Sequence, residues 1–167
     1  MLEEVLEIVD RKGKTIGLRK RSEVHGNPSL LHKVVHVLVF NDGGKLLLQK
    51  RSMNKDAEPG KWDTSVGGHV SPGEDFRTAA LREMKEELGI IPDEITLLYS
   101  HIYSSAYESE LVITYQCVHN GPFPFNLVEI DEVAFCDIDK IRQAAGSGIL
   151  SANFECELHE YISRRPI

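Results

Sequence analysis

Runs in which apolar and polar residues alternate recur along most of the chain, and this period of two predicts a protein rich in β-strands. Residues 3–9 and 15–18 flank a Lys-Gly-Lys turn and predict a strand pair. Residues 34–40 and 45–50 flank the turn sequence Asn-Asp-Gly-Gly and predict a β-hairpin. The second half of the chain repeats the pattern, and further strands are expected at residues 95–102, 111–118 and 133–136.

The period changes to that of a helix after the glycine-rich residues 67–73. Ala80, Met84 and Leu88 recur every four residues, so they share one face of a predicted helix. Gly89 follows at a position where helices commonly end. Strands, one helix, more strands and then helices predict an α/β fold, in which a mixed sheet is covered by helices on both sides. The last two helices are expected at residues 139–145 and 153–163.

Composition narrows the classes of protein that this pattern allows. The 167 residues suffice for one ordinary domain, and nineteen Lys or Arg against twenty-six Asp or Glu leave a net charge of −7. Clustered basic residues are needed to bind a nucleic-acid polymer, so we do not expect such a partner. The longest apolar stretch, residues 37–40, is too short to span a membrane, and we expect no secretory signal. Cys117, Cys136 and Cys156 show no metal or redox spacing, which indicates reduced thiols and a cytoplasmic protein.

The charges are unevenly distributed along the chain. Residues 11–61 contain twelve Lys or Arg and only four Asp or Glu, whereas acids predominate elsewhere. Such asymmetry is common on solvated surfaces. A basic segment followed by an acidic one is also suited to a ligand that combines phosphates with a metal ion.

Three glutamates of the predicted helix are candidates for metal binding. Glu83, Glu86 and Glu87 are spaced i, i+3 and i+4, which places them on one helix face. Carboxylates so placed repel one another, and a divalent cation such as Mg²⁺ would remove that repulsion. Because three glutamates on a helix are more often a solvated face, the triplet alone does not establish a metal site.

The glutamates belong to a longer pattern, G-x5-E-x7-R-E-U-x-E-E-x-G-U, in which U is apolar. Every specified position is present, namely Gly68, Glu74, Arg82, Glu83, Met84, Glu86, Glu87, Gly89 and Ile90. The segment resembles the signature of the Nudix superfamily, the Nudix box. The resemblance covers about residues 30–163 and implies an α/β/α sandwich with a mixed β-sheet. It also implies that residues 1–30 are an amino-terminal strand extension and residues 31–167 the Nudix domain.

The resemblance implies a chemistry as well. Most Nudix proteins hydrolyse a nucleoside diphosphate linked to another group, and they use Mg²⁺ or Mn²⁺. Glu74 and Arg82 would brace the loop against the helix. The implied metal ligands are Glu83, Glu86, Glu87 and the backbone carbonyl of Gly67.

The remaining catalytic roles stay open at this level. The proton of the attacking water would pass to a carboxylate of the box, Glu86 or Glu83, or to one of a later loop, such as Glu110. Basic side chains near the box are candidates for binding the phosphates, although each is readily explained as a surface residue. These are Lys50, Arg51 and Lys61.

A second set of residues resembles the metal site of the type 1 isopentenyl-diphosphate isomerases, which are Nudix relatives. The set is His25, His32, His69, Glu108 and Glu110, and it would suit Zn²⁺, Mn²⁺ or Mg²⁺. In such an isomerase Glu110 would be an acid/base residue. However, the isomerases need a cysteine where this chain has Gly67, and they generally lose part of the glutamate cluster that is intact here. Both departures favour hydrolysis.

Three functions therefore follow from the sequence, and hydrolysis of a small-molecule diphosphate is favoured. The alternatives are an isomerase-like reaction and a catalytically silent diphosphate-sensing module. His36, which alternates with Val35 and Val37, is expected to be an ordinary sheet residue. The amino-terminal strands could also pair across a homodimer.

Overall fold

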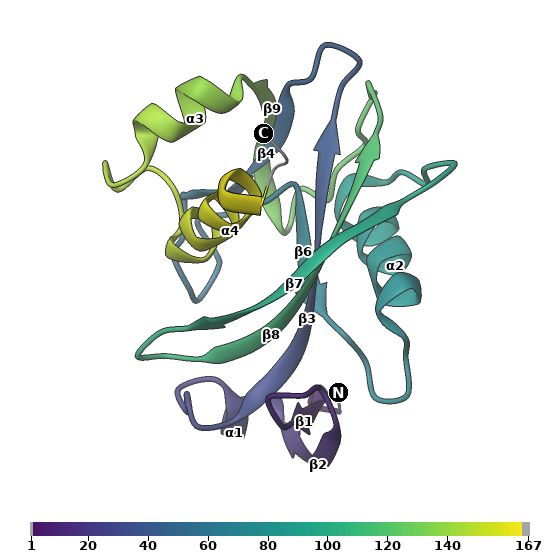
Figure 1. The fold of residues 1–167 in the computed structure, drawn as a ribbon, viewed down its shortest axis with the longest axis vertical. Helices are drawn as coiled ribbons and strands as arrows, with labels where there is room; N and C mark the ends of the chain where they lie inside the picture. Colours follow the sequence, from purple (N-terminus) through teal and green to yellow (C-terminus); the bar gives the residue numbers. More distant parts are fainter. Residues whose placement is uncertain (1, 165–167) are drawn as a thin grey trace.

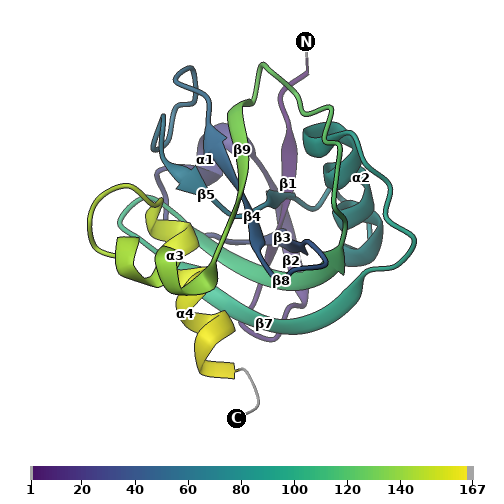
Figure 2. The ribbon, with the colours of Figure 1, turned by 90° about the horizontal axis from the view of Figure 1, so that it is seen from above.

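The computed structural model describes residues 2–164, which form one mixed sheet with helices on both faces (Figures 1 and 2). The strands are β1 (Val5–Val9), β2 (Thr15–Lys20), β3 (Leu31–Phe40), β4 (Leu46–Arg51), β5 (Trp62–Asp63), β6 (Val66–His69), β7 (Thr96–Ser104), β8 (Ser109–Val118) and β9 (Ile130–Cys136). The helices are α1 (Arg21–Val24), α2 (Phe76–Leu88), α3 (Ile138–Ala144) and α4 (Ala152–Arg164). The predicted α/β/α sandwich with a mixed sheet is confirmed.

The long strand β3 organises the sheet. It runs parallel to β8 along its whole length. On its other edge it pairs antiparallel with β1 at His32, with β6 at residues 34–37 and with β4 at Phe40. Since β3 is covered on both faces, its sequence is a nearly continuous run of apolar residues rather than a strict alternation.

Two apolar cores lie on opposite faces of this sheet, and β3 contributes to both because successive side chains of a strand point to opposite faces. Figures 1 and 2 show α2 on one side of the sheet and α3 and α4 on the other. The α2 core includes Val35, Val37, Val39, Ala80, Met84 and Leu88. The core beneath α3 and α4 includes Leu38, Leu46, Ile141, Phe154 and Leu158.

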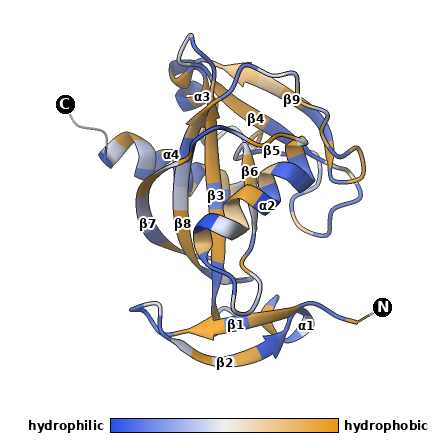
Figure 3. Cartoon of the chain, turned by 90° about the vertical axis from the view of Figure 1, so that its right-hand side faces the viewer, coloured by the Kyte–Doolittle hydropathy of each residue, from blue (hydrophilic) through white to orange (hydrophobic). Residues whose placement is uncertain are grey.

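The β1–β2 hairpin and α1 lie against one end of β3, as Figure 3 shows. Leu6, Ile8 and Val24 form a small core of their own there. The position of this hairpin matters because it brings Glu4 and His25 to the cavity described below. The division into an extension and a Nudix domain stays a prediction, as does the homodimer. Met1 and residues 165–167 lie outside the described residues.

Each strand and helix expected from the sequence is present, with bounds that differ by a few residues. Three short elements were not expected: α1, β5 and β6. These elements are too short to show a periodic pattern of their own. Pairing with β4 holds β5 in place, and pairing with β3 holds β6 in place. Within residues 2–164, no helix has the length and apolar character needed to cross a membrane.

Candidate active site

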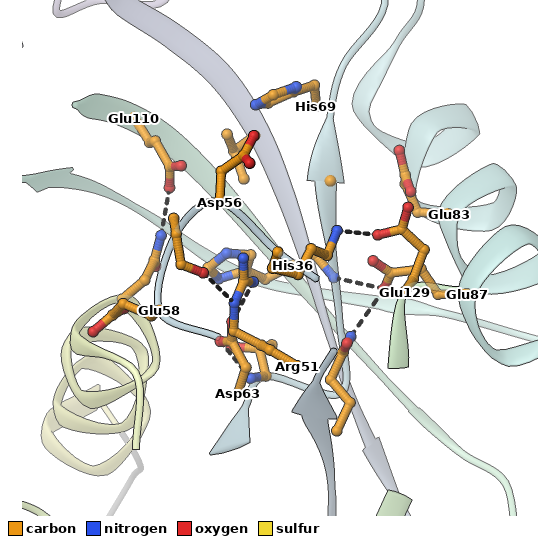
Figure 4. A pocket seen from close by; sticks show the side chains of 18 of the residues that line it. His36, Arg51, Asp56, Glu58, Asp63, His69, Glu83, Glu87, Glu110 and Glu129 are labelled. Carbon is orange, nitrogen blue, oxygen red and sulfur yellow. Dashed lines mark hydrogen bonds and ion pairs between the residues drawn. The ribbon is translucent and has the colours of Figure 1, made fainter. Parts of the chain in front are cut away.

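A cavity of about 510 Å³ opens between α2, β6, the loop after β4 and the start of β8. In Figure 4 the carboxylates of Glu83 and Glu87 lie on one side, Glu110 lies on the other, and His36 and Arg51 lie between them. Most of the residues singled out in the sequence line this cavity: His25, Arg51, Gly67, His69, Glu83, Glu86, Glu87, Glu108 and Glu110.

Local sequence signals fix the two ends of α2 and hence the positions of its glutamates. Before the first turn, Oδ1 of Asp75 accepts a hydrogen bond of 2.8 Å from the backbone N–H of Thr78. After the last turn, Gly89 adopts a left-handed conformation with φ of 67°, which a residue with a side chain rarely tolerates. The helix between them buries its apolar face in the sheet and directs the glutamates to the cavity.

Glu87 is the α2 carboxylate most closely tied to the sheet. Its Oε2 accepts hydrogen bonds from the backbone N–H of Gly67, at 3.2 Å, and from Nε2 of Gln49, at 3.1 Å. Burial and the charge of Glu83 raise the pKa of Glu87 to about 8, while the two donors act in the opposite direction. Ionising this carboxylate is therefore costly unless a cation lies nearby, as expected of a ligand for a hard metal ion.

Arg82 holds the loop before α2 against the sheet. Its Nε and Nη2 each donate a hydrogen bond of 2.9 Å to a different oxygen of Glu74. Nη2 also donates to the carbonyl of His69, at 2.9 Å. Nη1 contacts Glu83 at 2.7 Å and Glu86 at 3.2 Å. The guanidinium thus combines the bracing contact expected from the sequence with contacts to two of the predicted metal ligands.

Gly67 and Gly68 allow α2 and the sheet to approach each other closely. A Cβ at Gly68 would overlap the carboxyl group of Glu83, so a side chain at this position would displace that carboxylate. A Cβ at Gly67 would lie 3.3 Å from Cδ2 of His36. Contacts with residues distant in the sequence therefore leave no room for a side chain at Gly68 and little room at Gly67.

The second set of predicted ligands is assembled in the structure. Among residues 2–164, two groups of three or more His, Cys, Asp or Glu side chains have ligand atoms that all lie within 4.8 Å of one another. These groups are His25, His32 and His69, and His32, Glu108 and Glu110. The register of the sheet contributes directly, because His32 of β3 lies opposite Glu110 of β8. We call these five residues the His/Glu cluster.

The electrostatics of the His/Glu cluster favour the neutral forms of His25 and His32. Burial, reinforced by the neighbouring His69, lowers the pKa of His25 to about 4 and that of His32 to about 3. Neither ring nitrogen of the fully buried His32 has a hydrogen-bond partner. Burial and the charge of Glu110 raise the pKa of Glu108 to about 7. Neutral imidazoles with unused nitrogens beside carboxylates are suited to a divalent metal, so these residues fit such an ion.

Three residues that the sequence did not single out hold the predicted ligands in place. Oε1 of Glu4 lies 3.0 Å from Nδ1 of His69, and Nδ2 of Asn153 donates to Oε2 of Glu110 at 2.8 Å. Gln49 makes the corresponding contact with Glu87. Groups that orient ligands in this way are typical of metal sites. Each is far from its partner in sequence, so no local pattern marks it.

The predicted phosphate-binding residues are placed unequally. Arg51 lines the cavity and donates hydrogen bonds of 3.0 Å to Asp63 and to the carbonyl of Ala57. Lys50 is not among the lining residues, because neighbouring side chains of β4 point to opposite faces.

Lys61 is also outside the lining, and its Nζ donates to the carbonyl of Gly148. Two basic residues that were not predicted line the cavity together with Arg51, namely Arg21 and Lys55. Lys55 forms an ion pair with Glu129. The basic segment noted in the sequence, residues 11–61, therefore contributes Arg21, Arg51 and Lys55 to the cavity. Of these three, Arg51 was predicted.

The α/β/α sandwich, with an acidic helix and basic side chains around one cavity, indicates an enzyme that acts on phosphates. Residues 30–154 match the family model of the NUDIX domain, and the chain belongs to this family. It is an enzyme of the Nudix pyrophosphohydrolase class. Members of the family act on small-molecule diphosphates and generally use divalent metal ions.

Relatives of the chain carry two kinds of names within this family. It is 35% identical over 137 residues to an isopentenyl-diphosphate Δ-isomerase from Streptomyces avermitilis, covering 78% of this chain and 70% of that protein. It is 48% identical over 123 residues to an uncharacterised Nudix hydrolase from Listeria monocytogenes, covering 72% of each. A crystal structure of a protein from Deinococcus radiodurans matches with a TM-score of 0.81 at 25% identity, covering 94% of this chain and 98% of that one. The predicted membership of the Nudix superfamily is confirmed.

Proposed function

We propose that the protein is a metal-dependent hydrolase that cleaves the diphosphate linkage of a nucleoside diphosphate derivative or a related organic diphosphate. The observation that carries this proposal is the partly buried carboxylate of Glu87, which is hydrogen-bonded to Gly67 in a cavity that also contains basic side chains. The ion would be Mg²⁺ or Mn²⁺, held by Glu83, Glu86, Glu87 and the carbonyl of Gly67. This donor set fits, because hard divalent cations take carboxylate and carbonyl oxygens. Such an ion supplies charge neutralisation at the phosphates and lowers the pKa of nearby water.

The basic residues of the cavity would bind the substrate's phosphates. Arg51 is anchored by Asp63 and by the carbonyl of Ala57, so its guanidinium is held in a fixed position. A planar guanidinium suits the paired oxygens of a phosphate, whereas the ammonium of Lys55 acts as a point charge. We therefore assign phosphate binding to Arg51 and Lys55.

Glu86 is the carboxylate best placed to accept the proton of the attacking water. Its side chain is 57% exposed and lines the cavity, so water reaches it. Glu83 is more enclosed, and burial raises its pKa. Burial also raises the pKa of Glu110, which is bound to Asn153 on the far side of the cavity. Glu83 and Glu110 remain the alternatives.

The His/Glu cluster would hold a second divalent cation. The unpartnered nitrogens of His32 and the depressed pKa values of His25 and His32 support this assignment. A cation there would also offset the charges of Glu108 and Glu110, which otherwise face each other in a partly enclosed space. Two cations, together with Arg21, Arg51 and Lys55, would offset part of the negative charge of the acidic cavity where a diphosphate binds.

A second candidate function is isomerisation of an isopentenyl-type diphosphate. The His/Glu cluster and the relative from Streptomyces avermitilis favour it. Against it stands Gly67, which offers no acid/base group at the position where those isomerases carry a cysteine. None of Cys117, Cys136 and Cys156 lines the cavity, and burial raises the pKa of Cys117 to about 11. We therefore place hydrolysis first.

A panel of diphosphates tests the proposal. Metal-stripped protein receives Mg²⁺ or Mn²⁺ and then nucleoside diphosphates, nucleotide sugars, dinucleotides or prenyl diphosphates, and phosphate and nucleotide products are measured. We expect metal-dependent cleavage of at least one class, with incorporation of ¹⁸O from labelled water into a phosphate product. Glu87→Gln should abolish turnover.

Glu132→Gln is the matched control, because Glu132 is exposed on β9 and does not line the cavity. It should retain wild-type turnover. Double-bond migration without phosphate release would favour the isomerase instead, and full activity of Glu87→Gln would contradict the metal assignment.

A further inference from the structure

Tyr107 is the only Phe, Tyr or Trp among residues 2–164 that lines the cavity. It lies in the turn between β7 and β8, and its ring centroid is 5.7 Å from that of His25. The residue remains 43% exposed. Trp62 packs instead against the core beneath α3 and α4, and Phe125 against the α2 core. Tyr107 therefore offers the aromatic surface that a ligand in the cavity can reach.

Hydrogen bonds hold the backbone of this turn in place. Oγ of Ser105 accepts hydrogen bonds from the backbone N–H groups of Tyr107, at 3.0 Å, and of Glu108, at 3.1 Å. The carbonyl of Tyr107 accepts a hydrogen bond of 2.9 Å from the backbone N–H of Gly26, in the loop after α1. Because the backbone is anchored on both sides, little conformational entropy is lost when a ligand contacts the ring.

The surroundings of Tyr107 favour a planar group with polar edges. Apart from Tyr107, the side chains that line the cavity are polar or charged, with the exceptions of Val34 and Ala57. A prenyl chain would find little apolar surface there, and its binding depends on such surface. Glu4, which contacts His69, and its ion-pair partner Arg21 supply hydrogen-bonding groups instead. A nucleobase combines a flat face for an aromatic ring with edges for such groups.

We propose that Tyr107 is a specificity-determining residue whose ring stacks on the base of a nucleoside diphosphate substrate. The inference rests on the proposed function and deepens it, because it selects nucleoside diphosphate derivatives over other organic diphosphates. The base lies at the end of the cavity formed by the turn between β7 and β8. The amino-terminal hairpin and α1 then contribute to substrate recognition through Glu4 and Arg21.

Analogues that water does not cleave separate the base from the phosphates. The α,β-methylene analogues of ADP, GDP, CDP and UDP, and methylenediphosphonate, which has no base, are titrated into the protein by calorimetry at saturating Mg²⁺. We expect at least one nucleotide analogue to bind the wild type more tightly than methylenediphosphonate. In Tyr107→Ala the affinity for that analogue should fall about 5- to 100-fold, the range typical of a lost stacking contact. The affinity for methylenediphosphonate should not change.

Two further variants test whether the ring itself is responsible. Tyr107→Phe keeps the ring and should keep the preference for the nucleotide analogue. Leu97→Ala is the matched control, because Leu97 is an exposed apolar residue of β7 outside the cavity, and it should keep wild-type affinities. The inference would be overturned by a wild type without the preference, by an equal loss in Tyr107→Phe, or by an equal loss of methylenediphosphonate binding in Tyr107→Ala.

Kinetics distinguish this inference from the proposed function. Phosphate release from a nucleoside diphosphate derivative should show the same loss of kcat/KM in Tyr107→Ala, whereas a loss confined to prenyl diphosphates would overturn the inference. Phosphate release by the wild type without any preference for the nucleotide analogues would also overturn it and leave the proposed function standing. Absence of phosphate release, with the preference present, would instead overturn only the proposed function.

Discussion

The backbone of Gly68 lies against the carboxyl group of Glu83, with no space for a Cβ between them. Gly68→Ala would therefore move Glu83 or β6. Because misplacing a group at a reacting centre by about 1 Å costs up to about 100-fold in rate, we expect a loss of about that size in kcat/KM. Steady-state kinetics at saturating Mg²⁺ would measure it.

Gly17→Ala provides the control, since the nearest atom to a Cβ there, Nη1 of Arg19, is 3.7 Å away. This variant should keep wild-type kinetics. Unchanged kinetics in Gly68→Ala would show that the contact with Glu83 does not constrain the site.

Arg82 and Glu74 make a contact that lysine cannot reproduce. Arg82→Lys would lose one of the two hydrogen bonds to Glu74 and the fork that also reaches the carbonyl of His69. Since the Arg82 side chain is 31% exposed, solvent screening limits the effect, and we expect the free energy of unfolding to fall by about 1–2 kcal/mol. Urea denaturation would measure this change.

The comparison is Arg142→Lys, which alters an exposed pair with Asp139 at 3.7 Å. No measurable loss of stability is expected there. Equal losses in the two variants would mean that the contact with Glu74 contributes no more than a surface ion pair.

Local patterns predicted those parts of the fold that have a periodicity of their own. The spacing of Ala80, Met84 and Leu88 identified the buried face of α2, and Gly89 marked its end. β5 and β6 are too short and too rich in polar or glycine residues to show such a period. Their strand character comes from pairing with β4 and β3, which is information that a local window does not contain.

Local sequence patterns were likewise insufficient to predict which side chains line the cavity. Arg51 and Lys50 are equivalent candidates in sequence, and the face to which each points follows from the register of β4. His36 has the pattern of an ordinary strand residue, and its partner Glu157 lies 121 positions away. The His/Glu cluster was anticipated through a family resemblance, because neither spacing nor composition links His25 to Glu108.

The raised pKa of Glu87 predicts how stability depends on pH in the absence of metal. In the folded protein its pKa is about 8, whereas an unperturbed glutamate has a pKa of 4.5, so between these values the folded state binds the proton more strongly than the unfolded state. Stability contributed by the protonated form is therefore lost as the pH rises through 8, with a slope of at most about 1.4 kcal/mol per pH unit. Glu87→Gln cannot ionise, so its stability relative to the wild type should increase between pH 6 and pH 8.5.

Urea denaturation in EDTA at these two pH values measures the difference. Adding Mg²⁺ at pH 8.5 should stabilise the wild type more than Glu87→Gln, which would keep only the site of the His/Glu cluster. The control Glu132→Gln should differ from the wild type by the same amount at both pH values. A difference for Glu87→Gln that does not depend on pH would contradict the raised pKa.

The glutamates of α2 and the His/Glu cluster predict two separate metal sites, which should respond to different mutations. His32 belongs to both triplets of the His/Glu cluster. Neither of its ring nitrogens has a hydrogen-bond partner, so replacing it breaks no hydrogen bond to the glutamates of α2. We therefore expect His32→Asn to remove one Mn²⁺ site and Glu87→Gln to remove the other. Titration of free Mn²⁺ by electron paramagnetic resonance should give two sites in the wild type, one in each variant and none in the double variant. Two sites in His32→Asn would refute metal binding by the cluster, whereas two sites in Glu87→Gln would refute it for the helix, so each assignment is tested independently of the other.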